Sequence, residues 1–278
     1  MIKLNYLRSL LSASQAQILR MASTGALLSG ALLLSTQALS AGASVGAGLG
    51  ITTEFTGSDE LTVIPIAEFE IPTKIGILKN DQLGAQLDLV KNTSLDTGPI
   101  IRFNTGRNDS VTDDVVAALP EIEGSFEAGW FIGSGFKVSS LGLASDAIVI
   151  GRLSVVSDIG DGHGGTVVNG SLGLVMDVSE KLRLIPSVSF VHGNDEYTNA
   201  FYGVDAADAS AELGSFNASG GIETAQIALV GIQQINPRWF VKGIAAYNTL
   251  QDDAAESSIA RRGSDDQIFA GFTVNYRY

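Results

Sequence analysis

Apolar residues alternate with small or polar residues along short stretches of this chain, and this period of two constrains its fold more than any other feature. In residues 124–138 one face is mostly apolar, with Phe126, Ala128, Trp130, Ile132, Ser134 and Phe136. The other face is polar or small except for Phe131, with Ser125, Glu127, Gly129, Gly133, Gly135 and Lys137. Successive side chains of a β-strand point to opposite faces, so the pattern predicts strands with one apolar face.

The same alternation predicts about twelve strands, with ten as the alternative, since single-chain bacterial barrels have an even number. The predicted ranges are 44–53, 61–71, 74–78, 82–89, 99–107, 124–138, 147–158, 168–178, 182–192, 224–235, 239–250 and 267–278. The ranges before residue 98 follow the pattern least well. Pro65 and Pro72 lie there, and proline in a strand predicts an edge, a bulge or a turn.

The hydrophobic residues after residue 40 are not grouped into stretches long enough to form membrane-spanning helices. Hydrophobic residues make up 45% of the chain and charged residues 17%. After residue 40, however, no apolar run reaches the roughly 18 residues that a spanning helix needs. The second face of the predicted strands is rich in Gly, Ser and Gln and poor in charge, which disfavours a soluble β-sandwich. The sequence therefore predicts an all-β, transmembrane, antiparallel up-and-down β-barrel with a small, polar lumen.

The charge balance and the cysteine count exclude several kinds of site. The formal net charge is −13, and no basic stripe is present, so nucleic acid is a poor candidate partner. The chain has no cysteine, which excludes a disulfide framework and a thiolate metal site.

Residues 1–40 read as a signal peptide. Three basic residues and no acidic ones precede Glu54, and residues 21–34 are apolar and as long as a signal-peptide core. Small residues follow, which predicts cleavage after Ser40, with Ala41 and Ala43 as near alternatives. A membrane-anchor helix is the alternative interpretation, but the apolar core is short for a span. The barrel is then residues 41–278, in the outer membrane.

The predicted connections differ in length in a regular way. They are long at 108–122, 193–223 and 251–266, medium at 139–146 and 159–167, and short at 179–181 and 236–238. Outer-membrane barrels have short periplasmic turns and longer outer loops. If both termini are periplasmic, all the long connections fall outside. The medium connection 139–146 fits this parity least well.

The last predicted strand is the most specific single element. It runs to the final aromatic residue with an alternating face of Ile268, Ala270, Phe272, Val274, Tyr276 and Tyr278. An alternating last strand that ends in an aromatic residue resembles the signal read by the outer-membrane barrel assembly machinery. That machinery is therefore an expected partner, beside outer-membrane lipid and lipopolysaccharide.

Acidic residues are concentrated in the predicted outer loops: Asp109, Asp113, Asp114, Glu121, Asp161, Asp195, Glu196, Asp205, Asp208, Glu212, Asp252, Asp253, Glu256, Asp265 and Asp266. Carboxylates are ligands for divalent cations, which could bridge to lipopolysaccharide phosphates. Solvated loop charge explains the same residues and is the favoured interpretation. No metal site is predicted.

Catalysis has weak support in the sequence. Residues 158–165 form a glycine-rich loop around His163, which could serve as a general base. His192 is the only other histidine, and no Gly-x-Ser-x-Gly nucleophile turn is present. A tight loop fixed by glycines is the better interpretation, and no catalytic or cofactor-binding residue is predicted.

The two faces of the predicted wall carry different candidate residues. The lumen candidates have both charge signs: Glu127, Lys137, Arg152, Asp177, Arg183 and Lys242. The aromatic candidates for girdles at the membrane interface are Trp130, Trp239, Tyr247, Tyr276 and Tyr278.

Several segments resemble, in order, the MltA-interacting protein / outer-membrane protein V family. They are residues 45–50 (VGAGLG), 55–61 (FTGSDEL) with Pro65, 98–102 (GPIIR) with 106–107, 162–165 (GHGG), 195–197 (DEY) with 202–204 (YGV), and 272–278 (FTVNYRY). The resemblance covers essentially the whole mature chain. It implies an outer-membrane barrel without shared catalytic residues. One member of the family is regarded as a scaffold between a lytic murein transglycosylase and a murein synthase, and others as surface antigens or adhesins.

Three functions follow as hypotheses. The first is a noncatalytic scaffold or interaction protein linked to murein remodelling, or a surface antigen. The second is a small pore, although about twelve strands leave limited interior space. The third, an outer-membrane hydrolase acting through His163, is the least supported.

Overall fold

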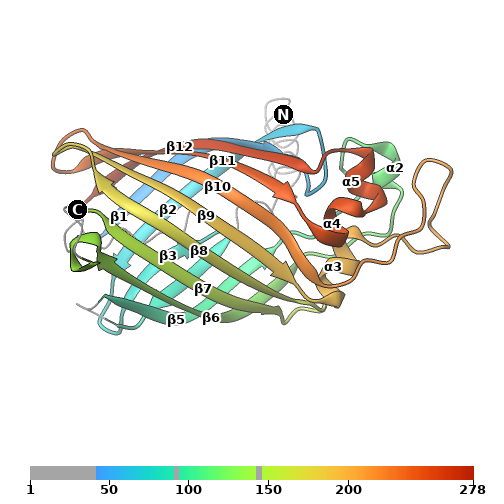
Figure 1. The fold of residues 1–278 in the computed structure, drawn as a ribbon, viewed down its shortest axis with the longest axis horizontal. Helices are drawn as coiled ribbons and strands as arrows, with labels where there is room; N and C mark the ends of the chain where they lie inside the picture. The colour runs from blue at the N-terminus through green and yellow to red at the C-terminus, as the bar shows by residue number, and fades with distance from the viewer. Residues whose placement is uncertain (1–41, 91–93, 142–145) are drawn as a thin grey trace, which may run out of the picture.

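In the computed structural model, which describes residues 42–90, 94–141 and 146–278, the chain forms a closed antiparallel β-barrel (Figure 1). Each strand pairs with the next along the chain, and the last returns to the first. The twelve strands of the described part are β1 (Ser44–Thr53), β2 (Leu61–Pro72), β3 (Ile77–Asp81), β4 (Gly84–Asp88), β5 (Leu95–Asn104), β6 (Ser125–Lys137), β7 (Ile148–Asp158), β8 (Thr166–Asp177), β9 (Leu182–Gly193), β10 (Gly221–Gln234), β11 (Trp239–Leu250) and β12 (Asp266–Arg277). The predicted twelve-strand barrel is confirmed, whereas the predicted signal peptide lies outside the described residues.

Short helices gather at one end of the barrel, here called the capped end (Figure 1). They are α2 (Asp114–Ala117), α3 (Asp195–Tyr202), α4 (Asp252–Glu256) and α5 (Ser258–Arg262). The opposite end, here called the turn end, holds the start of β1 and the end of β12, and the 3₁₀ helix η1 (Val138–Leu141). None of the helices in the described ranges is long and apolar enough to cross a membrane.

Most strand boundaries lie within two residues of the predicted ones, whereas both ends of β3 and β5 and the start of β10 differ by more. β1 and β11 have the predicted bounds, and β12 differs by one residue at each end. β3 starts later than predicted because Thr73 and Gly76 close a turn, with the Thr73 hydroxyl 2.8 Å from the Gly76 carbonyl oxygen. β5 ends earlier than predicted because Gly106, with φ +66°, turns the chain out of the strand.

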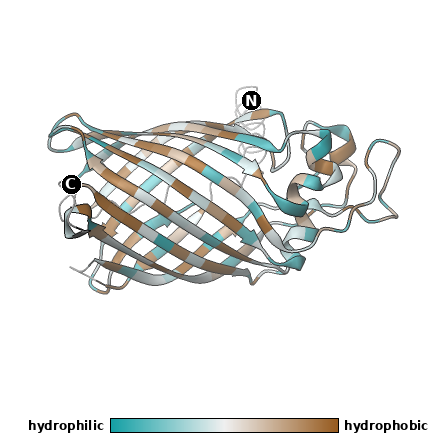
Figure 2. Cartoon of the chain, viewed as in Figure 1, coloured by the Kyte–Doolittle hydropathy of each residue, from teal (hydrophilic) through white to brown (hydrophobic). Residues whose placement is uncertain are grey.

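The outward face is apolar, as predicted for a wall in lipid. Large outward side chains remain exposed in mid-strand, with Leu172 59% and Ile227 61% accessible. Figure 2 shows hydrophobic and hydrophilic bands alternating along the strands. The face presented to lipid therefore follows from the period of two in the sequence.

The prediction of a small, polar lumen is wrong for half of the interior. Inward side chains of β2 and β8–β12 form a buried apolar cluster that contains Ile64, Ile66, Val175, Ile185, Ala228, Val230, Ile232, Phe240, Ile244, Ala246 and Phe269. In β9–β11 apolar residues occupy both faces, so alternation alone did not reveal the inward ones. The opposite inner wall, on β3–β7, buries charged side chains instead: Lys79, Asp81, Asp88, Asp96, Arg102 and Glu127.

Glycines allow the wall to bend sharply at two inward positions. A Cβ added at Gly48 would lie 1.7 Å from the carbonyl oxygen of Phe272, and one at Gly129 would lie 1.8 Å from that of Val155. Any side chain at these positions would push neighbouring strands apart. The lumen-facing glycines thus serve the curvature of the barrel.

Two strand pairs in the described barrel wall, β2 with β3 and β4 with β5, share fewer residue pairs than any other. The seam between β2 and β3 has three residue pairs, from Glu70–Lys79 to Pro72–Ile77, whereas β1 and β12 share nine. Beyond the seam, the Asn80 side chain accepts a hydrogen bond from the Phe69 amide at 3.1 Å. No described strand pairs with residues 61–69 of β2 on this side. Pro65 lies in this edge, as the sequence predicted for a distorted part of the wall.

Candidate functional site

The long connections all meet at the capped end. They are the loops 105–124, 159–165, 194–220 and 251–265. The short turns at 178–181 and 235–238 lie at the turn end, and the 138–147 connection with η1 lies there too. The three connections predicted to be long therefore lie at one end, whereas the 138–147 connection at the turn end is longer than the 159–165 loop and departs from the parity, at the point where the prediction was weakest. A gate, ligand site or closure formed by the long loops would therefore lie at the capped end.

Helix α3 closes the mouth of the barrel from inside the rim. Asn194 caps its N-terminus, accepting hydrogen bonds from the amides of Tyr197 at 3.2 Å and Thr166 at 2.8 Å. Tyr197, Phe201 and Tyr202 are buried and belong to one cluster with inward residues of β5–β8. Burial raises the pKa of both tyrosines well above their ordinary value, so they stay neutral.

Glu127 on β6 is the centre of the polar contacts beneath this helix. Its side chain is fully buried and accepts hydrogen bonds from Arg102 Nε, from Asn104 Nδ2 at 3.0 Å and from His163 Nε2 at 2.9 Å. Arg102 supplies the opposite charge. A buried carboxylate is tolerated only when it is paired and hydrogen-bonded in this way.

His163 has a defined tautomer and no free ring nitrogen. The Gly165 amide donates to its Nδ1 at 3.1 Å, so Nδ1 is an acceptor and the proton lies on Nε2, which donates to Glu127. The ring also packs edge-on against Tyr197, with centroids 4.9 Å apart. His163 therefore fastens the 159–165 loop to the wall.

Arg107 ties the loop 105–124 to helix α3. Its Nη1 donates to the carbonyl oxygen of Phe201 at 2.9 Å, in the last turn of α3, where a positive charge is favourable. Burial lowers the pKa of Arg107 to about 10, so it remains charged at neutral pH.

The loops above α3 have an apolar core of their own, which we call the cap core. It consists of Val111, Val116, Leu119, Val204, Leu213 and Ile259. At its edge Arg262 Nε lies 2.6 Å from Asp113 Oδ2 and Nη1 lies 3.5 Å from Glu212 Oε2, so one side chain joins three loops. Burial alone would raise the pKa of Asp113, but hydrogen bonds from Arg262 and from two backbone amides outweigh it and lower this pKa.

One loop projects beyond the cap. Residues 205–215 extend away from the barrel (Figure 1) and are mostly exposed. The base is closed by Val204 and Phe216, whose backbones exchange two hydrogen bonds of 2.8 and 2.9 Å. Leu213 is the anchor that returns to the cap core.

The predicted lumen charges point inward but do not form one site. Arg152 lies over the ring of Phe131 at 4.2 Å and donates to Gln86 at 2.6 Å. Lys242 pairs with Glu68 at 2.6 Å on the other side of the barrel. The remaining candidates, Lys137, Asp177 and Arg183, lie at the turn end. Arg152 and Lys242 thus each have partners of their own and do not converge on one site.

The other sequence candidates are distributed over the surface. At the turn end, the ring of Tyr276 makes edge-to-face contacts with Trp239 on one side and Tyr278 on the other, each with ring centroids 5.0 Å apart. Such a group is expected for an aromatic girdle. Trp130 faces outward in mid-strand, and His192 is exposed on the outer face of β9. Within the described residues, the acidic loops hold no group of three or more potential ligands placed to bind a metal ion.

Sequence reasoning missed the closure itself. It predicted no helix in the loops and did not single out Asn104 or Phe201, and it quoted Arg102, Tyr197 and Tyr202 only within segments that resemble the family, without a role. A signal for α3 was present, because Asn194 is a good N-cap residue and Tyr197 and Phe201 are four residues apart, on one helical face.

Comparison with known proteins gives a family and several structural likenesses. The family described as MltA-interacting protein MipA matches residues 45–278. Outer membrane protein OmpV of Vibrio cholerae serotype O1 is 30% identical over 95 residues, which are 34% of this chain and 36% of the relative. The match thus spans about a third of that relative's length.

Solved outer-membrane channels are similar in outline only. An outer membrane channel from Pseudomonas putida F1 has a TM-score of 0.44 and 9% identity, covering 87% of this chain and 97% of the channel. The toluene transporter TbuX of Ralstonia pickettii has a TM-score of 0.38 and 9% identity, covering 86% of this chain and 90% of the transporter. Scores this low carry no argument about transport.

Proposed function

The chain belongs to the family described as MltA-interacting protein MipA, and from this premise we propose that it is a noncatalytic interaction protein of the outer membrane, a scaffold for enzymes that remodel murein. The observation that carries the proposal is the closed mouth. Helix α3 is fixed into the rim through Glu127, His163 and Arg107, and the cap core lies above it. A barrel closed in this way presents surfaces to partners.

The packed interior supports the same role. Inward side chains from both halves of the wall are buried, whereas a lumen wide enough for water would leave them accessible. Two inward ion pairs join side chains of different strands, Arg102 with Glu127 and Lys242 with Glu68. These features favour a rigid support over a conduit.

In this proposal the capped end faces the outside and the turn end faces the periplasm, as in barrels with long outer loops and short periplasmic turns. The acidic loops then face lipopolysaccharide and the surroundings of the cell, where they also form the antigenic surface. β12 and Tyr278 form the segment that the barrel assembly machinery would read. Murein enzymes would meet the turns at 178–181 and 235–238.

Site-specific photocrosslinking in cells tests the scaffold role and the orientation together. A photoreactive residue at Glu180 or Asn236 probes the turn end, and one at Asp208 or Ala209 is the matched control at the capped end. We expect crosslinks to a murein enzyme from the turn end alone. Crosslinks from the capped end, or none from either end, would contradict the proposal.

A small pore is the competing function, and planar-bilayer recording separates the two. We expect the purified, folded protein to give no conductance steps, because α3, the cap core and the buried inward side chains obstruct the lumen of the described barrel. Regular conductance steps from the folded protein would contradict the scaffold proposal and support a channel.

A further inference from the structure

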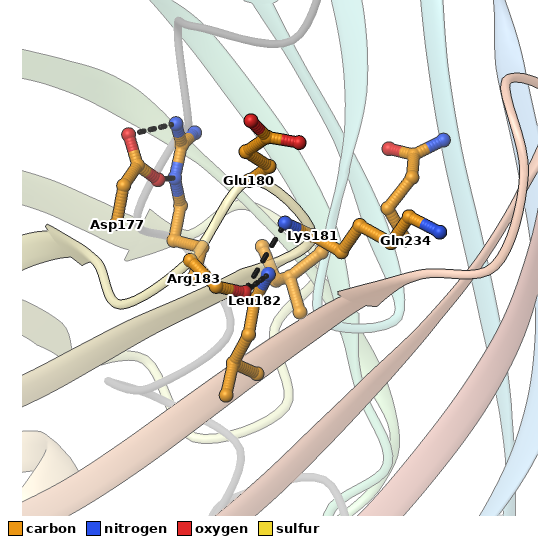
Figure 3. A pocket seen from close by; sticks show the side chains of 8 residues that line it. Asp177, Glu180, Lys181, Leu182, Arg183 and Gln234 are labelled. Atoms are coloured by element: carbon orange, nitrogen blue, oxygen red, sulfur yellow. Dashed lines mark hydrogen bonds and ion pairs between the residues drawn. The ribbon is translucent and has the colours of Figure 1, made fainter.

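A pocket of about 260 Å³ opens at the turn end, between the β8–β9 turn and the end of β10 (Figure 3). It is lined by Asp177, Ser179, Glu180, Lys181, Leu182, Arg183, Ile232 and Gln234. The lining carries two acidic and two basic side chains beside the apolar Ile232, which is buried on the inward face of β10.

The walls of the pocket are fixed before any ligand arrives. The Ser179 hydroxyl oxygen accepts hydrogen bonds from the amides of Lys181 at 3.3 Å and Leu182 at 3.1 Å, which closes the turn. The Gln234 amide donates to the Lys181 carbonyl oxygen at 2.8 Å and joins β10 to that turn. A ligand would therefore meet a preorganised site.

Arg183 is held in place with one donor to spare. Its Nε lies 2.6 Å from Asp177 Oδ1 and its Nη2 lies 3.0 Å from Asp177 Oδ2, and the side chain is only 11% accessible. Nη1 is buried, and no atom of the described residues accepts its hydrogen bond. A buried guanidinium N–H without an acceptor is unfavourable, so this atom favours an oxygen ligand, above all a carboxylate.

The charged side chains of Glu180 and Lys181 also line the pocket, beside Arg183. Figure 3 shows the carboxylate of Glu180 on the same side of the turn as the Arg183 guanidinium. In the described part of the chain, the head groups of Glu180 and Lys181 make no hydrogen bond or ion pair. They are exposed and available, one for a cation and the other for an anion.

We propose that this pocket binds a free dipeptide through both its carboxylate and its ammonium group. The carboxylate accepts from Arg183 Nη1 and from Lys181 Nζ, and the ammonium donates to Glu180. A small side chain of the dipeptide rests on Ile232. A volume of about 260 Å³ suits one or two small residues rather than a folded partner. The site is independent of the scaffold role, since it requires only the folded barrel.

Calorimetric titration of the purified barrel in micelles tests the site. The probes are L-Ala-L-Ala and D-Ala-D-Ala, each beside its N-acetyl and C-terminal amide derivatives. We expect a free dipeptide to bind in the millimolar range and each blocked derivative to bind about tenfold more weakly, since each loses a charge-assisted hydrogen bond. A preference for the D form identifies a dipeptide released from murein as the source, and a preference for the L form identifies one released from a protein. Equal affinity supports charge recognition alone.

Variants locate the binding in this pocket. Lys181→Met and Arg183→Met should each weaken dipeptide binding about tenfold by the same loss. Arg238→Met is the control, because Arg238 lies on the neighbouring turn and does not line the pocket. Since Arg183→Met also breaks the pair with Asp177, its folding is checked by circular dichroism, and Lys181→Met keeps the test decisive. No binding of either free dipeptide, or equal loss in Arg238→Met, overturns the proposal.

Discussion

Nε2 of His163, in the loop between β7 and β8, lies 2.9 Å from Oε1 of Glu127 on β6. This contact fastens the cap to the inner wall of the barrel. Glu127 joins its own strand to β5 as well as to this loop, because Arg102 and Asn104 of β5 donate to the same carboxylate. The stability of the closed mouth should therefore depend on one side chain.

Replacing Glu127 with leucine should destabilise the barrel by about 3–5 kcal/mol, because the Arg102 charge is left buried without its partner. Urea unfolding in micelles, followed by the fluorescence of Trp130 and Trp239, measures the change. Asp161→Asn, in the exposed part of the same loop, is the control and should change stability by less than about 0.5 kcal/mol. A Glu127 variant as stable as this control would remove the anchoring role.

Gly165→Ala should release α3 from the loop beneath it. A Cβ at Gly165 would lie 2.4 Å from the backbone nitrogen of Tyr197, and backbone atoms cannot give way without moving the helix. Hydrogen exchange should then speed up in residues 194–202. Gly214→Ala is matched to it, because nothing lies within 4 Å of the added Cβ in the projecting loop. Similar exchange in both variants would contradict the contact.

The clamp between Arg262 and Asp113 should open in acid. The pKa of Asp113 in the folded protein lies below its ordinary value of 3.8, so the unfolded chain takes up the proton first. The contribution of the clamp is therefore complete above that ordinary value and is lost as the pH falls through the lower, folded value. Limited proteolysis of loop 205–215 should accelerate in that acidic range.

Arg262→Met should produce the same rapid cleavage at neutral pH, without a large loss of barrel stability, because the pair is exposed. Arg261→Met is the control, since that neighbouring side chain forms no ion pair among the described residues. Equal protection in both variants would show that the cap core alone holds the loop.

The edge of β2 beyond its seam with β3 should exchange its amide hydrogens faster than β1, which is paired on both sides. A disulfide across the seam, in the variant I71C/L78C, should slow that exchange and raise the unfolding temperature. The protein has no cysteine of its own, so the bond forms without competitors. Uniform exchange through β1, β2 and β3 would argue against a weak seam.

The sequence revealed the wall well because lipid selects one face of each strand. In β11 and β12 this selection leaves a clear period of two, and their bounds were predicted to within a residue. The apolar half of the lumen could not be predicted in the same way, since Val230 and Ile244 look like lipid-facing residues until the register places them inside.

The site was less accessible to sequence reasoning for a different physical reason. Glu127, Arg102 and His163 come from two strands and a loop, and only the closure of the barrel brings them together. The alternation indicated that Glu127 faces inward but not which donors it meets. The helices of the cap are short and derive their stability from tertiary packing, so their local sequence patterns were weak.

If the capped end faces the outside, as proposed, the projecting loop has a consequence for variation at the cell surface. The paired backbones of Val204 and Phe216 separate residues 205–211 from the cap, while Glu212 and Leu213 secure the return. Changes at 205–211 should leave the barrel wall intact, so this stretch is free to diverge between strains. The same isolation makes it a natural insertion point for displaying a foreign epitope.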